Sequence, residues 1–148
     1  PVTLLGTAFA FVHLFEALDG RGVSALPALP AGSRVMETGG FKGQSREVER
    51  GALHRTIAER IGVEATRVVN QYGMTELGSQ FYDSSLVEPS GRLRKLGPPW
   101  ARVRIVDPET GADVEPGEIG MISILDLAIR TSRHAAHSRA EPRAISKN

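Results

Sequence analysis

The sequence contains no cysteine. This absence excludes a disulfide framework, a thiolate metal site and a cysteine nucleophile, and it is consistent with a reducing, cytoplasmic location. The chain also lacks a strong charge of either sign, because its 148 residues carry a formal net charge of only +1. A balance of this kind argues against nucleic acids or membrane surfaces as partners.

The sequence has no apolar run long enough to span a membrane. Its most hydrophobic stretch, Pro1–Leu18, is interrupted by His13 and Glu16, whereas a spanning helix needs about 20 apolar residues in succession. We interpret this stretch as a buried strand followed by a helix. Because the chain begins directly in such core-like sequence and without Met, we expect further sequence upstream.

Hydrophobic residues make up 41% and charged residues 24% of the chain, a balance typical of a globular protein. The residue spacing predicts strands at 1–5, 34–36 and 67–70, with helices at 9–18 and 45–61. Gly62 is expected to end the second of these helices. Gly51 is expected to divide the same helix into two short ones.

Two further strands are predicted at 102–106 and 118–125, joined by a connection rich in turn residues. In the first of them, Arg102 and Arg104 alternate with apolar residues, as in a strand with one wet face. The order β-α-β-α-β followed by an all-β segment predicts an α/β fold. We expect a layered sheet with helices plus an antiparallel β segment.

The character of the sequence changes at Ile129. Residues 129–148 have more basic than acidic residues, few large apolar side chains and no periodicity. We predict a basic, disordered tail for this segment. His134 and His137 have a spacing found in metal sites, but the tail offers no further ligands, so we expect no metal there.

The most informative segment is 70–83, which reads N-Q-Y-G-M-T-E-L-G-S-Q-F-Y-D. A predicted strand ends at Asn70, and open α/β folds bind ligands at the carboxyl ends of their strands. The Thr75 hydroxyl could donate to a phosphate oxygen, the Glu76 carboxylate could hold Mg²⁺, and the Tyr72 ring could stack on a base. A strand and turn with a buried tyrosine and a helix-capping threonine would also fit, so residue chemistry leaves both interpretations open.

Three segments of the chain resemble the acyl-protein synthetase (LuxE-type) branch of the AMP-forming, adenylate-forming ligase superfamily, in order and in spacing. The resemblance covers about residues 1–128, and it implies a fragment of the large N-terminal domain of such an enzyme. The segments are Y-G-M-T-E at 72–76 with its continuation at 77–83, E-T-G-G-F-K-G at 37–43, and the later strands from 96 to 120.

The resemblance implies roles for individual residues. Thr75 would contact an ATP phosphate and Glu76 would hold the Mg²⁺ that bridges the phosphates, so both are candidate catalytic residues. Residues 6–15 would lie near the hydrophobic pocket for the carboxylic acid. The nucleotide-binding set would be Gly39, Gly40, Tyr72, Gly73, Met74 and Thr75, with the glycine pair allowing a close backbone approach.

The activity implied by the resemblance is ATP-dependent activation of a carboxylic acid, in this branch a fatty acid, followed by acyl transfer. The continuation at 77–83 favours a protein thiol as the acyl acceptor. Transfer to coenzyme A remains an alternative, as does a non-catalytic remnant that binds nucleotide weakly or not at all.

Three parts of the superfamily's machinery have no counterpart in this sequence. They are a phosphate loop rich in Ser, Thr and Gly, an aspartate that binds ribose, and a C-terminal domain with a lysine. The aspartate should follow residues 126–128 by a dozen or so positions, and Asp126 itself does not match it. We therefore expect a fragment that is inactive by itself. A shifted reading frame or a gene break would account for the tail.

Overall fold

The computed structural model describes residues 1–39 and 49–129, together with the backbone of 136–139. The chain divides into two compact units. The first comprises Pro1–Gln71 and Asp83–Gly91, and the second comprises Tyr72–Tyr82 and Arg92–Asn148. In the described part of the chain, no helix is long and apolar enough to cross a membrane.

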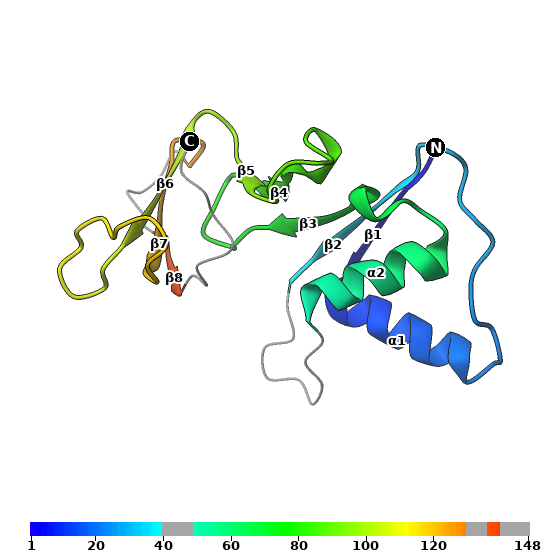
Figure 1. Cartoon of the computed structure of the whole chain (residues 1–148). Helices are drawn as coiled ribbons and strands as arrows, with labels where there is room; N and C mark the ends of the chain where they lie inside the picture. The colour runs from blue at the N-terminus through cyan, green and yellow to red at the C-terminus, as the bar shows by residue number, and fades with distance from the viewer. Residues whose placement is uncertain (40–48, 130–135, 140–148) are drawn as a thin grey trace. The chain divides into compact units, whose positions relative to one another are not determined.

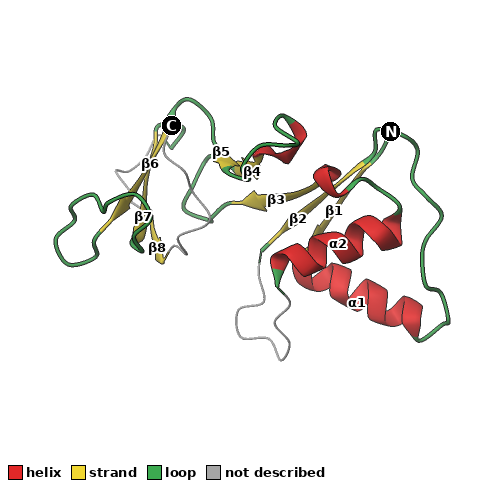
Figure 2. Ribbon diagram, viewed as in Figure 1, coloured by secondary structure: helices red, strands yellow, loops and turns green. Residues whose placement is uncertain are grey.

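The first unit is a parallel sheet with helices on one face (Figure 1). Strands β1 and β3 each pair with β2 in parallel. Figure 2 shows both α-helices on the same side of these strands. The elements are β1 (Thr3–Thr7), α1 (Ala8–Asp19), β2 (Arg34–Thr38), α2 (Arg50–Ile61), β3 (Val68–Tyr72) and the 3₁₀ turns η1 (Ala65–Arg67) and η2 (Ser84–Leu86).

A hydrophobic core lies between this sheet and its two helices. It forms because apolar residues recur at helical spacing in α1 and α2 and at every second position in the strands. Phe11 and Phe15 belong to this core, although the family resemblance placed residues 6–15 near an acid-binding pocket. The buried members are Ala8, Phe11, Phe15, Val35, Leu53, Ile57, Ala58, Ile61 and Val68.

The helix ends follow local chemistry. The Thr7 hydroxyl accepts a hydrogen bond from the backbone N–H of Ala10 at 3.0 Å and so caps α1. Gly62 ends α2 in the left-handed conformation, with φ of 70°, as predicted. Gly51, where two short helices were expected to meet, lies in the first turn of α2, which begins at Arg50, and residues 45–48 lie outside the described residues. The Gly51 N–H donates to the Glu49 carboxylate at 2.7 Å.

The predicted strands and helices of this unit are confirmed in order, with shifted ends. Strand β1 runs to Thr7 rather than ending at Leu5, and β2 and β3 each extend two residues further than predicted. The first strand is also less buried than expected, since Leu5 is 66% exposed. Residues 45–48, predicted as the start of the second helix, lie outside the described residues.

The second unit contains the predicted antiparallel hairpin. Strands β6 (Ala101–Val106) and β7 (Met121–Asp126) pair in antiparallel register. Arg102 and Arg104 are exposed, which confirms the predicted wet face. Two short strands were not predicted: β5 (Lys95–Leu96), and β4 (Phe81–Asp83), whose last residue belongs to the first unit. The core of this unit is formed by Phe81, Ile122 and Ile124.

One strand of this unit lies in the segment that the sequence predicts to be a disordered tail. Strand β8 (Ala136–Arg139) pairs with β7 in antiparallel register, so these four residues are not unstructured. His137 lies in this strand, while His134 and the remainder of 130–148 lie outside the described residues.

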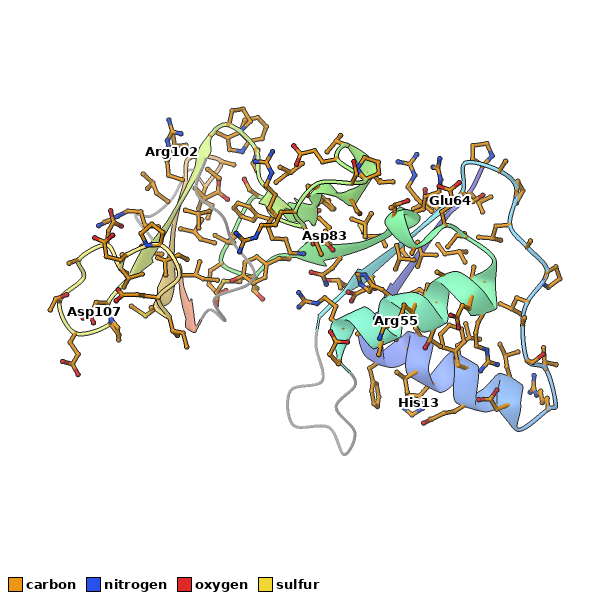
Figure 3. All side chains as sticks on the ribbon, viewed as in Figure 1. His13, Arg55, Glu64, Asp83, Arg102 and Asp107 are labelled. Atoms are coloured by element: carbon orange, nitrogen blue, oxygen red, sulfur yellow. The ribbon has the colours of Figure 1, made fainter. Side chains whose placement is uncertain are left out.

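The connection between β6 and β7 is closed by one carboxylate, that of Asp107. Its Oδ1 atom accepts hydrogen bonds from the backbone N–H groups of Glu109 and Thr110 and from the Thr110 hydroxyl. The backbone N–H of Thr110, then its hydroxyl and the N–H of Glu109, hold the pKa of Asp107 below its ordinary value. Figure 3 shows Asp107 in this loop.

Candidate functional site

The carboxyl ends of β1, β2 and β3 meet at one edge of the parallel sheet. The last residues of this register are Thr7, Thr38 and Gln71, and the Thr38 hydroxyl donates to the Gln71 carbonyl at 3.2 Å. In open α/β sheets this edge is where ligands bind. The chain segments that carry the predicted nucleotide-binding residues continue directly from Thr38 and Gln71.

A buried polar cluster lies one residue further into the sheet. Glu37 is 1% exposed and Asn70 is 3% exposed. The Asn70 side-chain amide donates to Glu37 Oε1 at 2.7 Å, and His54 Nε2 on α2 lies 2.9 Å from the same oxygen. Glu37 lies two residues after Val35 and so on the same face of the strand. This spacing is a sequence signal for the burial of Glu37, although it does not identify the partners of Glu37.

Asp83 extends this cluster in the first unit. Its Oδ2 atom accepts a hydrogen bond from the backbone N–H of Asn70 at 2.9 Å, and Asp83 is 6% exposed. Figure 3 shows Asp83 beside β3. The middle of β3 is therefore held through both the backbone and the side chain of Asn70.

Gly39 follows the last residue of β2. Its φ of 83° lies in the left-handed region, which favours glycine. A Cβ atom built on Gly39 would meet no other atom of the described residues within 4 Å. The backbone conformation alone thus accounts for glycine at this position. Gly40, the second member of the predicted glycine pair, lies outside the described residues.

Thr75 and Glu76 occupy the centre of a tight turn in the second unit. The turn is closed by a hydrogen bond of 3.1 Å from the Leu77 N–H to the Met74 carbonyl. Both central residues are exposed and no helix follows them. The alternative that Thr75 caps a helix is therefore wrong, and the two side chains are accessible to a ligand.

Tyr72 precedes this turn and is half-buried. Its hydroxyl donates to Met74 Sδ at 3.3 Å. Its ring centroid lies 6.3 Å from that of Phe81, with the ring planes inclined at 62°. Tyr72 thus packs against the core of the second unit, and Met74 is fixed through its sulfur atom. Gly73 between them is exposed.

Three residues beyond Glu76, the chain is anchored by a polar cluster that sequence reasoning missed. The Ser79 hydroxyl donates to Asp126 Oδ1 at 2.9 Å, and the Trp100 indole N–H donates to Ser79 Oγ at 2.9 Å. A surface pocket of about 440 Å³ lies here, lined in part by Ser79, Gln80 and Trp100. No local sequence pattern joins these residues, so no signal could have found them.

The turn could provide one ligand of a magnesium ion. Glu76 offers exposed carboxylate oxygens, which are hard ligands of the kind that Mg²⁺ prefers. The described residues contain no group of three or more His, Asp or Glu side chains that could hold a metal ion. Any Mg²⁺ at Glu76 would therefore take its other ligands from water and from substrate phosphates.

The sequence profile of one protein family, described as acyl-protein synthetase, LuxE, matches residues 1–136. The chain belongs to the acyl-protein synthetase (LuxE) family. The match extends beyond Ala128, where the resemblance was expected to end. It confirms the family identified from the Y-G-M-T-E segment and its two companion segments.

One curated relative in this comparison is the long-chain-fatty-acid–luciferin-component ligase of Aliivibrio fischeri. It is 27% identical to this chain over 131 residues, which cover 86% of this chain and 32% of the relative. The LuxE-family chain thus spans about one third of the length of this relative.

Solved structures share the fold at lower identity. ATP-bound MatB from Rhodopseudomonas palustris has a TM-score of 0.53 at 20% identity and covers 83% of this chain and 22% of its own. MenE from Bacillus subtilis, an O-succinylbenzoate coenzyme A synthetase solved with ATP and magnesium ion, has a TM-score of 0.56 at 20% identity, covering 88% and 24%. The luciferase-like enzyme of the mealworm Zophobas morio has a TM-score of 0.57 at 17% identity, covering 91% and 30%.

These likenesses confirm the predicted fold class. The chain has the α/β fold of part of an adenylate-forming enzyme, with a sheet, helices and an antiparallel β segment. Each solved structure extends well beyond the matched region, because this chain covers less than one third of any of the three.

Proposed function

We propose that this LuxE-family chain is part of an AMP-forming ligase that activates a fatty acid with ATP. The observation that carries this proposal is the exposed turn with Thr75 and Glu76 at its centre, which follows the carboxyl end of β3. A hydroxyl and a carboxylate presented side by side suit a magnesium–triphosphate ligand. The family match and the ATP-bound solved structures with the same fold support that ligand.

In this proposal the turn provides the groups that meet the triphosphate. The Thr75 hydroxyl donates a hydrogen bond to a phosphate oxygen, and Glu76 contributes one carboxylate oxygen to Mg²⁺. The bound metal neutralises charge on the phosphates. Gly39, Gly40, Tyr72, Gly73 and Met74 provide backbone and side-chain surface for the remainder of the nucleotide. Catalysis of this kind depends on positioning and on charge neutralisation.

The proposed reaction has two halves. A carboxylate oxygen of the acid attacks the α-phosphorus of ATP, and the bond from that phosphorus to the departing pyrophosphate breaks. The product is an acyl-adenylate. In the second half, the sulfur of a deprotonated thiol attacks the acyl carbonyl carbon, and AMP leaves with the electron pair of the broken carbon–oxygen bond.

The acyl acceptor in this proposal is a protein thiol, as the continuation at 77–83 and the family profile suggest. Coenzyme A is the second candidate, since MenE, whose fold the chain shares, is a coenzyme A synthetase. The ligase would first be loaded with radiolabelled acid and then mixed, in parallel assays, with a thiol-bearing acceptor protein or with coenzyme A. Transfer of the label to one of them would distinguish the two acceptors.

Exchange of labelled pyrophosphate into ATP, measured over a panel of carboxylic acids, tests the first half-reaction. The assay uses a full-length ligase whose sequence includes residues 1–128 of this chain. We expect exchange that depends on a fatty acid. Absence of exchange with every acid in the panel would overturn the proposed function.

A further inference from the structure

A hydroxyl–carboxylate–indole network lies at the exit of the turn that carries Thr75 and Glu76. Ser79 is at its centre, because its hydroxyl donates to Asp126 Oδ1 and accepts from the Trp100 indole N–H, both at 2.9 Å. Ser79 and Asp126 are each 6% exposed, whereas Trp100 is 50% exposed. Three segments of the second unit thus meet at one oxygen atom.

Asp126 is the fixed end of this network. Its Oδ1 atom also accepts a hydrogen bond from the backbone N–H of Ala128 at 3.0 Å. The carboxylate is therefore also held by the segment that follows β7. Its Oδ2 atom is buried and has no hydrogen-bond partner among the described residues. A buried carboxylate needs its donors, because hydrogen bonds to a charged acceptor are stronger than those between neutral groups.

The turn between Tyr72 and Ser79 is anchored on both sides. On the entry side, Tyr72 packs against Phe81 and bonds to the sulfur of Met74. On the exit side, Leu77 packs against the core of the second unit, and Ser79 joins the polar network. The two central residues are exposed, so their placement depends on these anchors.

We propose that Ser79, Asp126 and Trp100 are positioning residues that fix the turn carrying Thr75 and Glu76. An apolar side chain at position 79 could fill the same space, but it would take the acceptor from the indole N–H and leave Asp126 Oδ1 with the Ala128 N–H and without the Ser79 hydroxyl. Because the Ser79 hydroxyl both donates and accepts, its two hydrogen bonds favour one position of the backbone at residue 79. The functional consequence rests on the proposed function, because that function assigns the triphosphate to Thr75 and Glu76.

The substitution Ser79→Ala tests the network with a minimal change of volume. Hydrogen–deuterium exchange, followed by mass spectrometry of the ligand-free chain, should show faster exchange in the peptide spanning 73–80, which includes the Leu77 N–H. Peptides from β6 and β7 should keep the exchange of the unaltered protein. Trp100 is the one tryptophan of the chain, and its fluorescence should move to longer wavelength as water replaces the Ser79 oxygen.

Thr110→Ala is the matched control. Thr110 Oγ1 donates to Asp107 Oδ1 at 3.0 Å in the exposed loop between β6 and β7, so this substitution also removes a hydroxyl–carboxylate bond from the second unit. We expect it to change neither the exchange of 73–80 nor the fluorescence of Trp100. A change equal to that of Ser79→Ala would overturn the proposal.

Trp100→Phe provides a second variant that should fold, since the indole is half exposed. It removes one donor from Ser79 and leaves the bond to Asp126, so we expect a smaller rise in the exchange of 73–80. Unaltered exchange of 73–80 in both variants would overturn the proposal. A uniform rise across all peptides would do the same, because it would show that these residues stabilise the whole unit rather than the turn.

The consequence for activity is measured separately in the full-length ligase. There Ser79→Ala should lower acid-dependent pyrophosphate exchange by about 10- to 100-fold, since small displacements of reacting groups have effects of this size. Thr110→Ala should leave the rate unchanged. Absence of pyrophosphate exchange in the unaltered ligase would contradict the proposed function. Hydrogen–deuterium exchange of 73–80 in the ligand-free chain would still decide whether Ser79 positions the turn.

Discussion

Glu37 Oε1 accepts a hydrogen bond from Asn70 and lies 2.9 Å from His54 Nε2, so one buried carboxylate oxygen joins β2, β3 and α2. The other oxygen of Glu37 is buried without a hydrogen-bond partner among the described residues. A buried carboxylate with few donors is strongly affected by the loss of any one of them. The contact therefore stabilises the sheet edge at which β2 and β3 end.

We predict that His54→Ala lowers the free energy of unfolding by about 1–3 kcal/mol, because it leaves a buried carboxylate with one donor fewer. Urea unfolding followed by circular dichroism would measure the change. His13→Ala is the matched control, since His13 lies 3.4 Å from Glu16 on α1 with both side chains about half exposed. Figure 3 shows His13 on the outer side of α1.

The control should cost less than about 0.5 kcal/mol, as is usual for exposed ion pairs. Equal losses for the two histidine substitutions would contradict the structural role assigned to the buried cluster. They would indicate instead that His54 contributes only through the helix itself.

A second prediction concerns the exposed turn. In the full-length ligase, Thr75→Ala and Glu76→Gln should each lower acid-dependent pyrophosphate exchange by about 10²–10³-fold, because each removes a contact to groups whose charge changes in the reaction. Both side chains are exposed, so the melting temperature should change little. Loss of activity in proportion to loss of stability would contradict the assigned roles.

The sequence predicted the β-α-β-α-β order of the first unit because that order depends on local spacing. Alternation in the strands and helical spacing in α1 and α2 are readable within a few residues. The strands β4 and β5 were missed because segments of three and two residues have no measurable period. Strand β8 was missed because its residues lack the alternation that marks a strand.

The candidate site divides in the same way. The turn residues were predicted as site residues because Y-G-M-T-E is a contiguous segment with a family resemblance. Glu37 and Ser79 were missed as cluster members because their partners are distant in sequence: Asn70 is 33 positions from Glu37, and Asp126 is 47 positions from Ser79. Burial of a polar group depends on such partners, and a single sequence carries no record of these pairings.

A third prediction concerns acid and the start of α2. The N–H of Gly51, and then that of Ala52, donate to the Glu49 carboxylate and hold its pKa below the ordinary value. Between the folded-state and unfolded-state pKa values of Glu49, the folded state therefore binds fewer protons than the unfolded state. The stabilisation is complete above the unfolded-state pKa and is lost as the pH falls through the lower, folded-state pKa.

Glu49→Gln should remove this pH dependence. The difference in urea midpoint between the unaltered protein and this variant should be largest near neutral pH and should vanish in acid. Glu59→Gln is the control, because Glu59 is an exposed carboxylate on the same helix and lies away from its first turn. A difference that persists in acid would show that Glu49 acts through packing rather than charge.

The last prediction is that the 148-residue chain does not catalyse adenylation by itself. Glu76 provides a single carboxylate, and the described residues contain no cluster that could hold a metal ion without substrate. The chain spans 32% of the curated relative. Reacting groups that are held loosely lose most of the rate gain from positioning, which reaches about 7–11 kcal/mol when complete.

Isothermal titration with Mg-ATP and a turnover assay on the purified chain test this prediction, and sedimentation tests its association. Among the described strands, β1 pairs with β2 alone, and Leu5 on it is 66% exposed. Because open strand edges pair with other chains, we expect oligomers at micromolar concentration. Adenylate formed above background would contradict the prediction, and micromolar affinity for ATP would show that the 148 residues hold the nucleotide without the remainder of a ligase.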